Sequence, residues 1–347
     1  MVIHRWRVLV IVSLGFGLFA ASRSLSAAAE GDASAGVPPL ALLKTIPIGG
    51  TGRWDYLCVD SMARRLYVPR STHIQILDLD TGALLGDVAD TNGVHGVALA
   101  PEQGLGFSSN GRDSTVSAFD LKTFKVTKTV KTGRNPDAII YDPASKHILS
   151  MNHTGGDVTV IDPAALDKDP VTVAVGGTLE FAVADGAGHV FVNVEDKGET
   201  VQIDSNANRV LARWPLAPGS EPTGLAIDID RHRLFVGCGN QKMIVLDSKS
   251  GKQLAALAIG QGVDGVAYEP ALGVAMSANG RDGTISVVKE TSVGTFETVA
   301  TVKTLNGART ITVDTKNRQA LLPCNVPDGK GGQTFGIAVV GAKETGK

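Results

Sequence analysis

The fold is decided by the segment SSNGRDSTVS at residues 108–117, because nearly the same ten residues, SANGRDGTIS, recur at residues 277–286. The two copies lie 169 residues apart, which is close to four units of 42 residues. A fixed period of this length is typical of repeat architectures, so further copies are expected at the same interval. In both copies Asn-Gly, a strong hairpin signal, precedes a short strand-like segment.

Seven repeats of this kind can be aligned along the chain. In each, a strand-like segment ends at an acidic or equivalent turn residue, and these markers are 40 to 45 residues apart: Asp60, Ala100, Asp142, Asp185, Asp228, Glu269 and Asp314. Second and third strand-like segments follow every marker, and six repeats add a fourth. Alternating apolar residues between Gly, Asp and Pro turns indicate antiparallel strands. The sequence therefore predicts an all-β fold, a seven-bladed β-propeller with four-stranded blades.

The two ends of the repeat array suggest how the ring closes. The last repeat stops after its third strand, whereas LLKTIPIGG at residues 42–50 resembles a fourth strand without the preceding three. Because an open array would leave two exposed sheet edges, we expect the N-terminal strand to complete the last blade. A single propeller domain is thus predicted over residues 42–347, preceded by a flexible segment at residues 30–41.

Residues 1–29 have the pattern of a secretory signal peptide. Arg5 and Arg7 precede an apolar stretch at residues 8–21, and an Ala-x-Ala site occupies residues 27–29. Fourteen apolar residues are too few for a retained anchor, which needs about 20. We therefore expect cleavage before Glu30, a periplasmic or secreted protein, and no membrane span after cleavage.

Charge and cysteine content argue against two broad classes, nucleic-acid-binding proteins and disulfide-stapled scaffolds, without excluding the first. The segment expected to be removed carries three arginines and no acidic residue, so 33 Lys+Arg become 30 against 35 Asp+Glu, a formal charge of −5. An acidic chain disfavours phosphate-rich partners such as nucleic acid, although a local basic patch stays open. Cys58, Cys238 and Cys324 cannot all pair within one chain, which argues against a disulfide scaffold.

Several strand motifs carry a resemblance to a known family. They are RRLYVPRS at residues 64–71, GHVFVNVE at 188–195, HRLFVGCG at 232–239, and the third strands VTVIDP and MIVLDS. On these motifs the chain resembles the YVTN-repeat propellers, an exported seven-bladed family typified by YncE, over nearly all of its expected mature length. The resemblance implies single-stranded DNA binding, while related propellers act as lactonases, lyases or parts of quinoprotein dehydrogenases.

Polar residues at the start of each first strand form a candidate site. Five residues before each marker, the positions hold Asp55, His95, Asp137, Glu180, Thr223, Asp264 and Arg309. In an antiparallel blade these residues share one face with the end of the second strand, so they should meet at the mouth of the central channel. They differ between repeats while staying polar, as a binding surface requires. Trp54 adjoins them and is expected either to stack on a ligand or to pack under a loop.

A second column, at the end of the second strand, adds amide and sulfur groups. It holds Arg70, Asn110, Asn152, Cys238, Asn279 and Cys324, with His153 beside it. Asn110 and Asn279 begin the repeated Asn-Gly turn, where both residues tolerate positive φ. We expect these asparagines either to shape the turn or to reach a ligand, and Asn152 is included in the ligand-binding set.

The residues of the two columns allow three alternatives for what occupies the channel mouth. Arg309 could neutralise an acidic neighbour in a water-filled, salt-bridged opening. Hard oxygen ligands with one imidazole suit a divalent metal such as Ca²⁺ or Mg²⁺, whereas two thiols with His95 or His153 would suit zinc or copper. The hard-ligand set comprises Asp55, His95, Asp137, Glu180 and Asp264. An organic ligand held directly is the third alternative.

Three functions follow from these alternatives. The first, favoured because the familiar catalytic motifs are missing, is a monomeric exported binding protein that recognises a small molecule or a periplasmic protein partner at the mouth. The second is a metal-dependent hydrolase, lactonase or lyase in which His95 acts as general base or acid. The third is single-stranded DNA binding, which needs a cationic groove and stacking aromatic residues.

Overall fold

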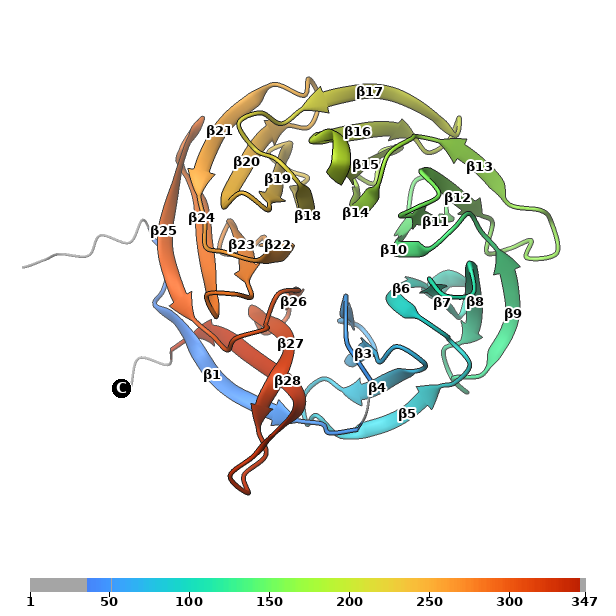
Figure 1. The fold of residues 1–347 in the computed structure, drawn as a ribbon, viewed down its shortest axis with the longest axis horizontal. Helices are drawn as coiled ribbons and strands as arrows, with labels where there is room; N and C mark the ends of the chain where they lie inside the picture. The colour runs from blue at the N-terminus through green and yellow to red at the C-terminus, as the bar shows by residue number, and fades with distance from the viewer. Residues whose placement is uncertain (1–35, 51, 344–347) are drawn as a thin grey trace, which may run out of the picture. The chain divides into compact units, whose positions relative to one another are not determined.

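The computed structural model describes residues 36–50 and 52–343, so the expected signal peptide and residues 30–35 lie outside the described part. Within it, β1–β28 form seven four-stranded antiparallel sheets arranged around a central channel (Figure 1). The predicted seven-bladed, all-β propeller is confirmed. In the described residues, no helix is long and apolar enough to cross a membrane.

Each of the first three blades runs outward from the channel in chain order. Blade 1 contains β2 (Cys58–Asp60), β3 (Arg65–Pro69), β4 (Ile74–Asp78) and β5 (Leu84–Val88). Blade 2 contains β6 (Val94–Ala100), β7 (Leu105–Asn110), β8 (Thr115–Asp120) and β9 (Val126–Lys131). Blade 3 contains β10 (Pro136–Asp142), β11 (His147–Asn152), β12 (Asp157–Ile161) and β13 (Val171–Ala174). A short 3-10 turn, η1 (Pro101–Gln103), joins β6 to β7.

The next three blades repeat this order. Blade 4 contains β14 (Leu179–Ala184), β15 (His189–Val194), β16 (Glu199–Asp204) and β17 (Arg209–Pro215), with η2 (Glu195–Lys197) inside it. Blade 5 contains β18 (Pro222–Asp228), β19 (Arg233–Cys238), β20 (Lys242–Asp247) and β21 (Gln253–Ala258). Blade 6 contains β22 (Val263–Glu269), β23 (Val274–Asn279), β24 (Thr284–Ser292) and β25 (Thr295–Lys303).

The last blade joins the two ends of the chain. It contains β26 (Thr312–Asp314), β27 (Gln319–Pro327) and β28 (Gln333–Ala342), and β1 (Leu40–Pro47) pairs antiparallel with β28 as the outer strand. The expected closure by an N-terminal strand is therefore confirmed. The strand begins at Leu40, and Val37 is already buried, so the end of the segment expected to be flexible belongs to the fold.

Apolar side chains fill the spaces between neighbouring blades. At the closure, Leu66 and Val68 of blade 1 share a buried cluster with Phe335 and Ile337 of blade 7. Burial of each side chain of this size stabilises the fold by about 1.5–3 kcal/mol relative to exposure. Both faces of every sheet are covered in this way, which gives the strand ends at the channel a rigid mount.

The repeated Asn-Gly segment forms a different turn from the one expected. Strand β7 ends at Asn110 and β8 begins at Thr115, so four residues connect them. Positive φ occurs at the last turn residue, Ser114 (52°), and at its counterpart Gly283 (61°), and neither Asn110 nor Gly111 adopts it. The expected turn between the second and third strands is therefore present, but it is longer than a two-residue hairpin loop and does not use the tolerance of Asn-Gly for positive φ.

Asn110 instead serves hydrogen bonding inside its own blade. Its Oδ1 accepts a bond of 2.9 Å from Ser108 Oγ, and its Nδ2 donates to Thr115 Oγ1 at 3.2 Å and Ser117 Oγ at 2.8 Å. Asn279 makes the same three bonds in blade 6. In each copy, the side chains of the repeated Ser-x-Asn and Thr-x-Ser segments therefore form one hydrogen-bond network that joins the second and third strands.

Candidate binding site at the channel mouth

The candidate site residues stand at irregular positions of the innermost strands. Strand pairing shifts register just after the first residue of β6, β10, β14, β18 and β22. The residues at these shifts are His95, Asp137, Glu180, Thr223 and Asp264. A β-bulge turns a side chain out of the regular alternation, and bulges are frequent beside functional sites. The fold thus releases these side chains from the blade interior and directs them to the channel.

Hydrogen bonds fix these strand starts to one another at every junction between neighbouring blades. The seven bonds, in ring order, are Tyr56 N to His95 O, Ser109 Oγ to Asp137 O, Leu179 N to His153 O, Asn193 Nδ2 to Thr223 O, Thr223 Oγ1 to Val263 O, Gly265 N to Arg309 O, and Thr310 Oγ1 to Asp55 O. Because each bond involves the backbone of a mouth residue or its neighbour, the mouth is held as one polar ring.

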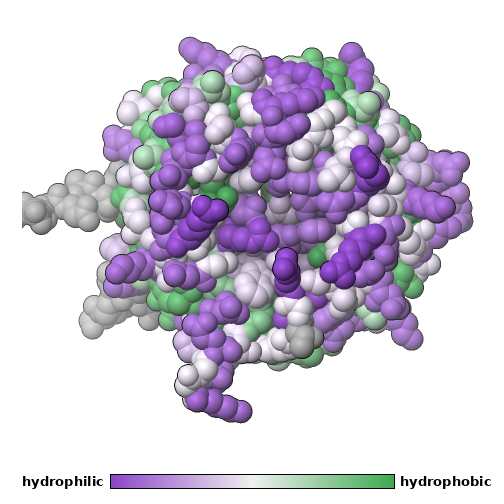
Figure 2. Space-filling view, in the orientation of Figure 1, coloured by the Kyte–Doolittle hydropathy of each residue, from purple (hydrophilic) through white to green (hydrophobic). Residues whose placement is uncertain are grey.

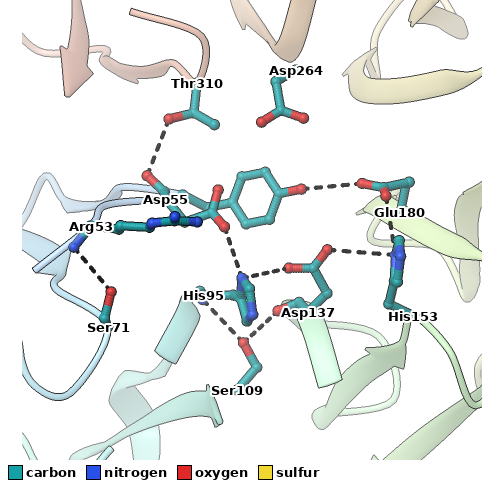
Figure 3. A network of polar contacts seen from close by, with 12 residues as sticks. Arg53, Asp55, Ser71, His95, Ser109, Asp137, His153, Glu180, Asp264 and Thr310 are labelled. Carbon is teal, nitrogen blue, oxygen red and sulfur yellow. Dashed lines mark hydrogen bonds and ion pairs between the residues drawn. The ribbon is translucent and has the colours of Figure 1, made fainter. Parts of the chain in front are cut away.

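Five side chains meet in what we call the acid–imidazole cluster: Asp55, His95, Asp137, His153 and Glu180 (Figure 3). His95 Nδ1 lies 2.8 Å from Asp55 Oδ2 and 3.1 Å from Asp137 Oδ1. His153 Nδ1 lies 3.1 Å from Glu180 Oε1 and 3.9 Å from Asp137 Oδ2. Asp137 therefore stands between the two imidazoles. Three of the expected carboxylates and His95 are brought together as predicted.

Asp264 is held apart from this cluster by Arg309. The Arg309 guanidinium contacts the Asp264 carboxylate directly, and its Nη2 lies 3.6 Å from Asp55 Oδ1. The expected neutralisation of an acidic neighbour by Arg309 is present. Asp264 thus belongs to an ion pair beside the cluster, although the sequence grouped it with the metal ligands.

Two residues of the cluster region were missed or underweighted at the sequence level. His153 follows the second column by one residue, and its ring turns back to Glu180 of the next blade. Tyr56 of blade 1 donates a hydrogen bond of 3.4 Å to Glu180 Oε2 and lies 4.9 Å, centroid to centroid, from the Phe181 ring of blade 4. Tyr56 therefore reaches across the channel. The sequence did indicate Tyr56 indirectly, because it directly follows Asp55, the first-column residue of blade 1.

Burial and charge change the acidities of these groups. Burial, helped by the nearby Asp55 charge, raises the pKa of Asp137 to about 8. Burial also raises the pKa of Asp264 to about 7, although the Arg309 charge opposes this. The hydrogen bond with Glu180 raises the pKa of His153 to about 9.

The pKa values of His95 and Tyr56 are also raised, which favours the protonated form of each side chain. Burial is the largest influence on His95 and lowers its pKa, but the hydrogen bond to Asp55 and the charge of Asp137 together raise it above the ordinary value. Burial, followed by the charge of Asp137, raises the pKa of Tyr56 well above its usual range. Asp137 and Asp264 thus retain protons near neutral pH, or require other cations in their place.

A cavity of about 210 Å³ opens beside the cluster. Trp54, Arg53, Arg112, His95 and Arg309 are among its lining residues. Arg53 and Arg112 are exposed, whereas Trp54 is half-buried and packs 5.1 Å from the Phe335 ring. Trp54 thus packs against its neighbours and also lines the cavity, and its stacking on a ligand stays a prediction. Figure 2 shows hydrophilic residues around the hollow at the centre of one face of the ring.

The amide column does not join the mouth. Asn110, Asn152 and Asn279 are at most 1% exposed, and their side chains bond within their own blades. Asn152 Nδ2 donates to Asp157 Oδ1 at 2.5 Å and to Thr159 Oγ1 at 2.8 Å. The structure therefore places these three residues in blade packing, so none of their three amides is exposed to a ligand.

The sulfur groups of the same column are also buried. Cys238 and Cys324 are free thiols in two separate hydrophobic clusters, each donating to a carbonyl of its own strand. Burial raises the pKa of Cys238 to about 12 and that of Cys324 to about 11. A zinc or copper site built from these thiols and a histidine, one of the alternatives left open by the sequence, is not formed.

Comparison with solved structures shows the fold. Hydrazine synthase from Kuenenia stuttgartiensis matches with a TM-score of 0.66 and 14% sequence identity, covering 81% of this chain and 94% of that one. At this identity the likeness concerns the propeller architecture alone. No curated protein matches the sequence. The finer resemblance to YncE, with its implied DNA binding, stays a prediction.

Comparison with protein families is more specific. The sequence profile described as "Cytochrome D1 heme domain" matches residues 67–293. This match begins in β3 of blade 1 and ends in the β24–β25 hairpin of blade 6, so it spans most of the ring. Because the match covers well over half of the sequence, the chain belongs to the Cytochrome D1 heme domain family.

Proposed function

We propose that this propeller is an exported binding protein whose channel mouth holds a small organic anion with a flat ring. The observation that carries the proposal is the cavity beside the acid–imidazole cluster, where two exposed guanidinium groups, Arg53 and Arg112, accompany the Trp54 indole. The lining comes from blades 1, 2, 3 and 7, so it exists only in the closed ring.

The chemistry of the lining defines the ligand class. A guanidinium group binds a carboxylate or phosphate through paired hydrogen bonds, and an indole face stacks on a flat ring. Arg309 is already bound by Asp264, which leaves Arg53 and Arg112 to meet the anion. A cavity of about 210 Å³ is smaller than the roughly 300–1,000 Å³ typical of drug-sized ligands, which favours a molecule with one ring.

The family description raises the question of a haem at this mouth. A tetrapyrrole needs an available axial nitrogen, and it carries carboxylates of its own. His95 Nδ1 faces Asp55 and Asp137, and its Nε2 points toward the Gly111 backbone, where an added Cβ would lie 2.8 Å away. The cavity of about 210 Å³ is also too small for a macrocycle of four rings. The described mouth residues therefore do not fit a haem.

Ligand binding can be tested through Trp54. After removal of residues 1–29, a Trp214→Phe substitution leaves Trp54 as the single tryptophan and so makes it the fluorescent reporter. We expect saturable quenching by benzoate or phenyl phosphate and none by uncharged benzamide. Arg112→Gln should weaken the binding at least about tenfold, since each charge-assisted bond contributes about 1.5–3 kcal/mol.

The repeated motif supplies a matched control. Arg281 occupies the same place in the second Asn-Gly-Arg-Asp copy, in blade 6, away from the residues that line this cavity. Arg281→Gln should leave the quenching curve unchanged. Equal effects of the two arginine substitutions, or quenching by benzamide as strong as by benzoate, would contradict the proposed site.

Export is tested separately. Cell fractionation should place the protein in the periplasm or medium, and N-terminal sequencing should begin at Glu30. A protein that retains residues 1–29 in the cytoplasm would remove this part of the proposal.

Metal-dependent hydrolysis or lyase chemistry is the second candidate, favoured by the carboxylate–imidazole–carboxylate arrangement of Asp55, His95 and Asp137. In this arrangement His95 would be a ligand rather than a general base, because its Nδ1 faces both carboxylates. Wild-type protein with Mn²⁺ should then cleave simple lactones or esters faster than Asp137→Asn. Equal rates for the two proteins would exclude this candidate.

A further inference from the structure

Asp137 divides the acid–imidazole cluster into two triads. One triad is Asp55, His95 and Asp137, and the other is Asp137, His153 and Glu180. In each triad, one nitrogen and two carboxylate oxygens lie within 4.8 Å of one another. The two oxygens of Asp137 face different imidazoles, Oδ1 toward His95 and Oδ2 toward His153.

Protein hydrogen bonds alone do not complete this arrangement. The Nδ1 of His95 carries at most one proton, and its hydrogen bond joins Asp55 Oδ2. Asp137 Oδ1 is therefore buried without a hydrogen-bond partner among the described residues, in a residue that is only 8% exposed. Asp55 Oδ1 also lacks a hydrogen-bond partner, although Arg309 Nη2 lies 3.6 Å from it. Buried carboxylate oxygens without partners are costly unless a cation compensates them.

The spacing of the donor atoms matches ligands that share an ion. Metal–ligand bonds of about 2.0–2.2 Å place neighbouring donor atoms of one ion about 3 Å apart. His95 Nδ1 is 2.8 Å from Asp55 Oδ2 and 3.1 Å from Asp137 Oδ1, and His153 Nδ1 is 3.1 Å from Glu180 Oε1. The longer 3.9 Å separation of His153 Nδ1 from Asp137 Oδ2 still allows a common ion between them.

The geometry points to a centre for two divalent transition-metal cations, one in each triad, with Asp137 as the shared ligand. Each ion has one imidazole and two carboxylates as protein ligands, a mixed set that suits Mn²⁺, Fe²⁺ or Zn²⁺ better than the all-oxygen shell of Ca²⁺. This inference uses the same cluster as the second candidate function, but it requires no catalysis.

Charge explains why two ions are accommodated. Asp55, Asp137 and Glu180 supply three negative charges, whereas neutral imidazoles supply none. With these three carboxylates ionised and both imidazoles neutral, as metal ligands must be, two bound divalent cations give the cluster a net charge of +1, beside the cavity lined by Arg53 and Arg112. A cluster that carries two metal ions and one excess positive charge would attract an anion to that cavity.

The test counts ions with Mn²⁺ as the probe. The full chain, purified without a histidine tag and stripped with a chelator, is titrated with Mn²⁺ by calorimetry, and the loaded protein is examined by electron paramagnetic resonance. We expect two ions per chain and the multiline spectrum of a coupled pair. Fewer than one ion at 100 µM Mn²⁺, or two ions with uncoupled spectra, would overturn the shared centre.

Matched variants identify the ligands. Glu180→Gln should lower the stoichiometry to one ion and abolish the coupled spectrum, and Asp137→Asn should weaken both sites at least about a hundredfold. Asp264→Asn is the control, because Asp264 belongs to the same column but is held by Arg309. Circular dichroism checks that each variant is folded. Loss of one ion in Asp264→Asn, or two ions retained in Glu180→Gln, would contradict the assignment.

The outcome is independent of the proposed activities. Two coupled ions without ester or lactone cleavage would support the centre and exclude the hydrolase. Ester or lactone cleavage that depends on a single bound ion would support the hydrolase and contradict the two-ion centre. Quenching of Trp54 by benzoate in chelator-treated protein would support the anion site whether or not ions bind.

Discussion

The buried asparagines and the acid–imidazole cluster lie at adjacent columns of the same blades, yet they are built in opposite ways. Asn110 and Asn279 repeat the same hydrogen bonds, and all their partners belong to the same blade. The first-column residues vary from blade to blade, and the side chain of His95 meets the carboxylates of Asp55 and Asp137 in the two neighbouring blades.

This difference separates residues that build a blade from residues that need the ring. A side chain satisfied within its own blade can recur in every repeat, because each copy experiences the same surroundings. A side chain that meets a neighbour at the channel has surroundings found once in the molecule. Repetition therefore indicates packing here, and variation indicates the site.

The largest expected effect is a pH dependence of folding stability, which tests the charged residues of the channel mouth. Because Asp264 has an ordinary pKa of 3.8 when unfolded and about 7 when folded, the folded protein binds more protons between these values. Stability should then fall as pH rises from about 4 to about 7, by up to about 4 kcal/mol. Asp264→Asn should remove this part of the decline. Urea unfolding of chelator-treated protein at pH 4.5 and 7.5 measures it, and identical pH dependence in the two proteins would contradict it.

The second prediction tests the repeated, buried asparagines. Asn110→Leu leaves the buried hydroxyls of Ser108 and Ser117 without their amide partner, which should cost about 3 kcal/mol of folding stability. Asn279→Leu should cost the same within about 0.5 kcal/mol, since its contacts are equivalent. Urea midpoints of both variants decide the matter. A loss in only one of them would show that the two copies are not equivalent.

The third prediction concerns the glycines where the two regions touch. A Cβ on Gly111 would lie 2.6 Å from Asn135 Oδ1 and 2.8 Å from His95 Nε2, whereas one on Gly280 would lie 2.7 Å from Arg309 Cβ. Each Gly→Ala substitution should cost about 1–3 kcal/mol in stability from overpacking. Gly111→Ala should also weaken Mn²⁺ binding by displacing His95, and Gly280→Ala should not. Equal Mn²⁺ affinity in the two variants would contradict this account.

The fold was predictable because propeller packing imposes the same demands on every repeat. The 42-residue period and the unpaired strand at residues 42–50 were sufficient to predict seven blades and the closure at β28. The role of Asn110 was also present in the sequence, since Thr115 and Ser117 follow it at fixed offsets that recur after Asn279. We instead related Asn-Gly to positive φ, which applies to shorter hairpin loops.

The site was only partly predictable. Antiparallel geometry placed Asp55, His95 and Asp137 in one column, and they do meet. His153 was underweighted because its contact with Glu180 depends on a ring orientation between blades, and Tyr56 because its contact crosses the channel. Such partners depend on side-chain orientation and on the placement of neighbouring blades, which a repeat pattern in the sequence does not specify.

The smallest expected effect concerns the aspartate that ends each Asn-Gly-Arg-Asp copy. Asp282 Oδ2 accepts a hydrogen bond of 2.8 Å from the backbone N of Gln261, whereas Asp113 Oδ1 accepts one of 2.9 Å from the side chain of Asn92. Both sites are exposed. A backbone donor is held in place by the fold, so Asp282→Ala should lower stability by about 1 kcal/mol, near the typical net value of a hydrogen bond. The Asn92 side chain can turn to water instead, and Asp113→Ala should cost less than about 0.5 kcal/mol. Urea midpoints resolve this difference, and a larger loss for Asp113→Ala would mean that this aspartate supports the mouth through its own blade.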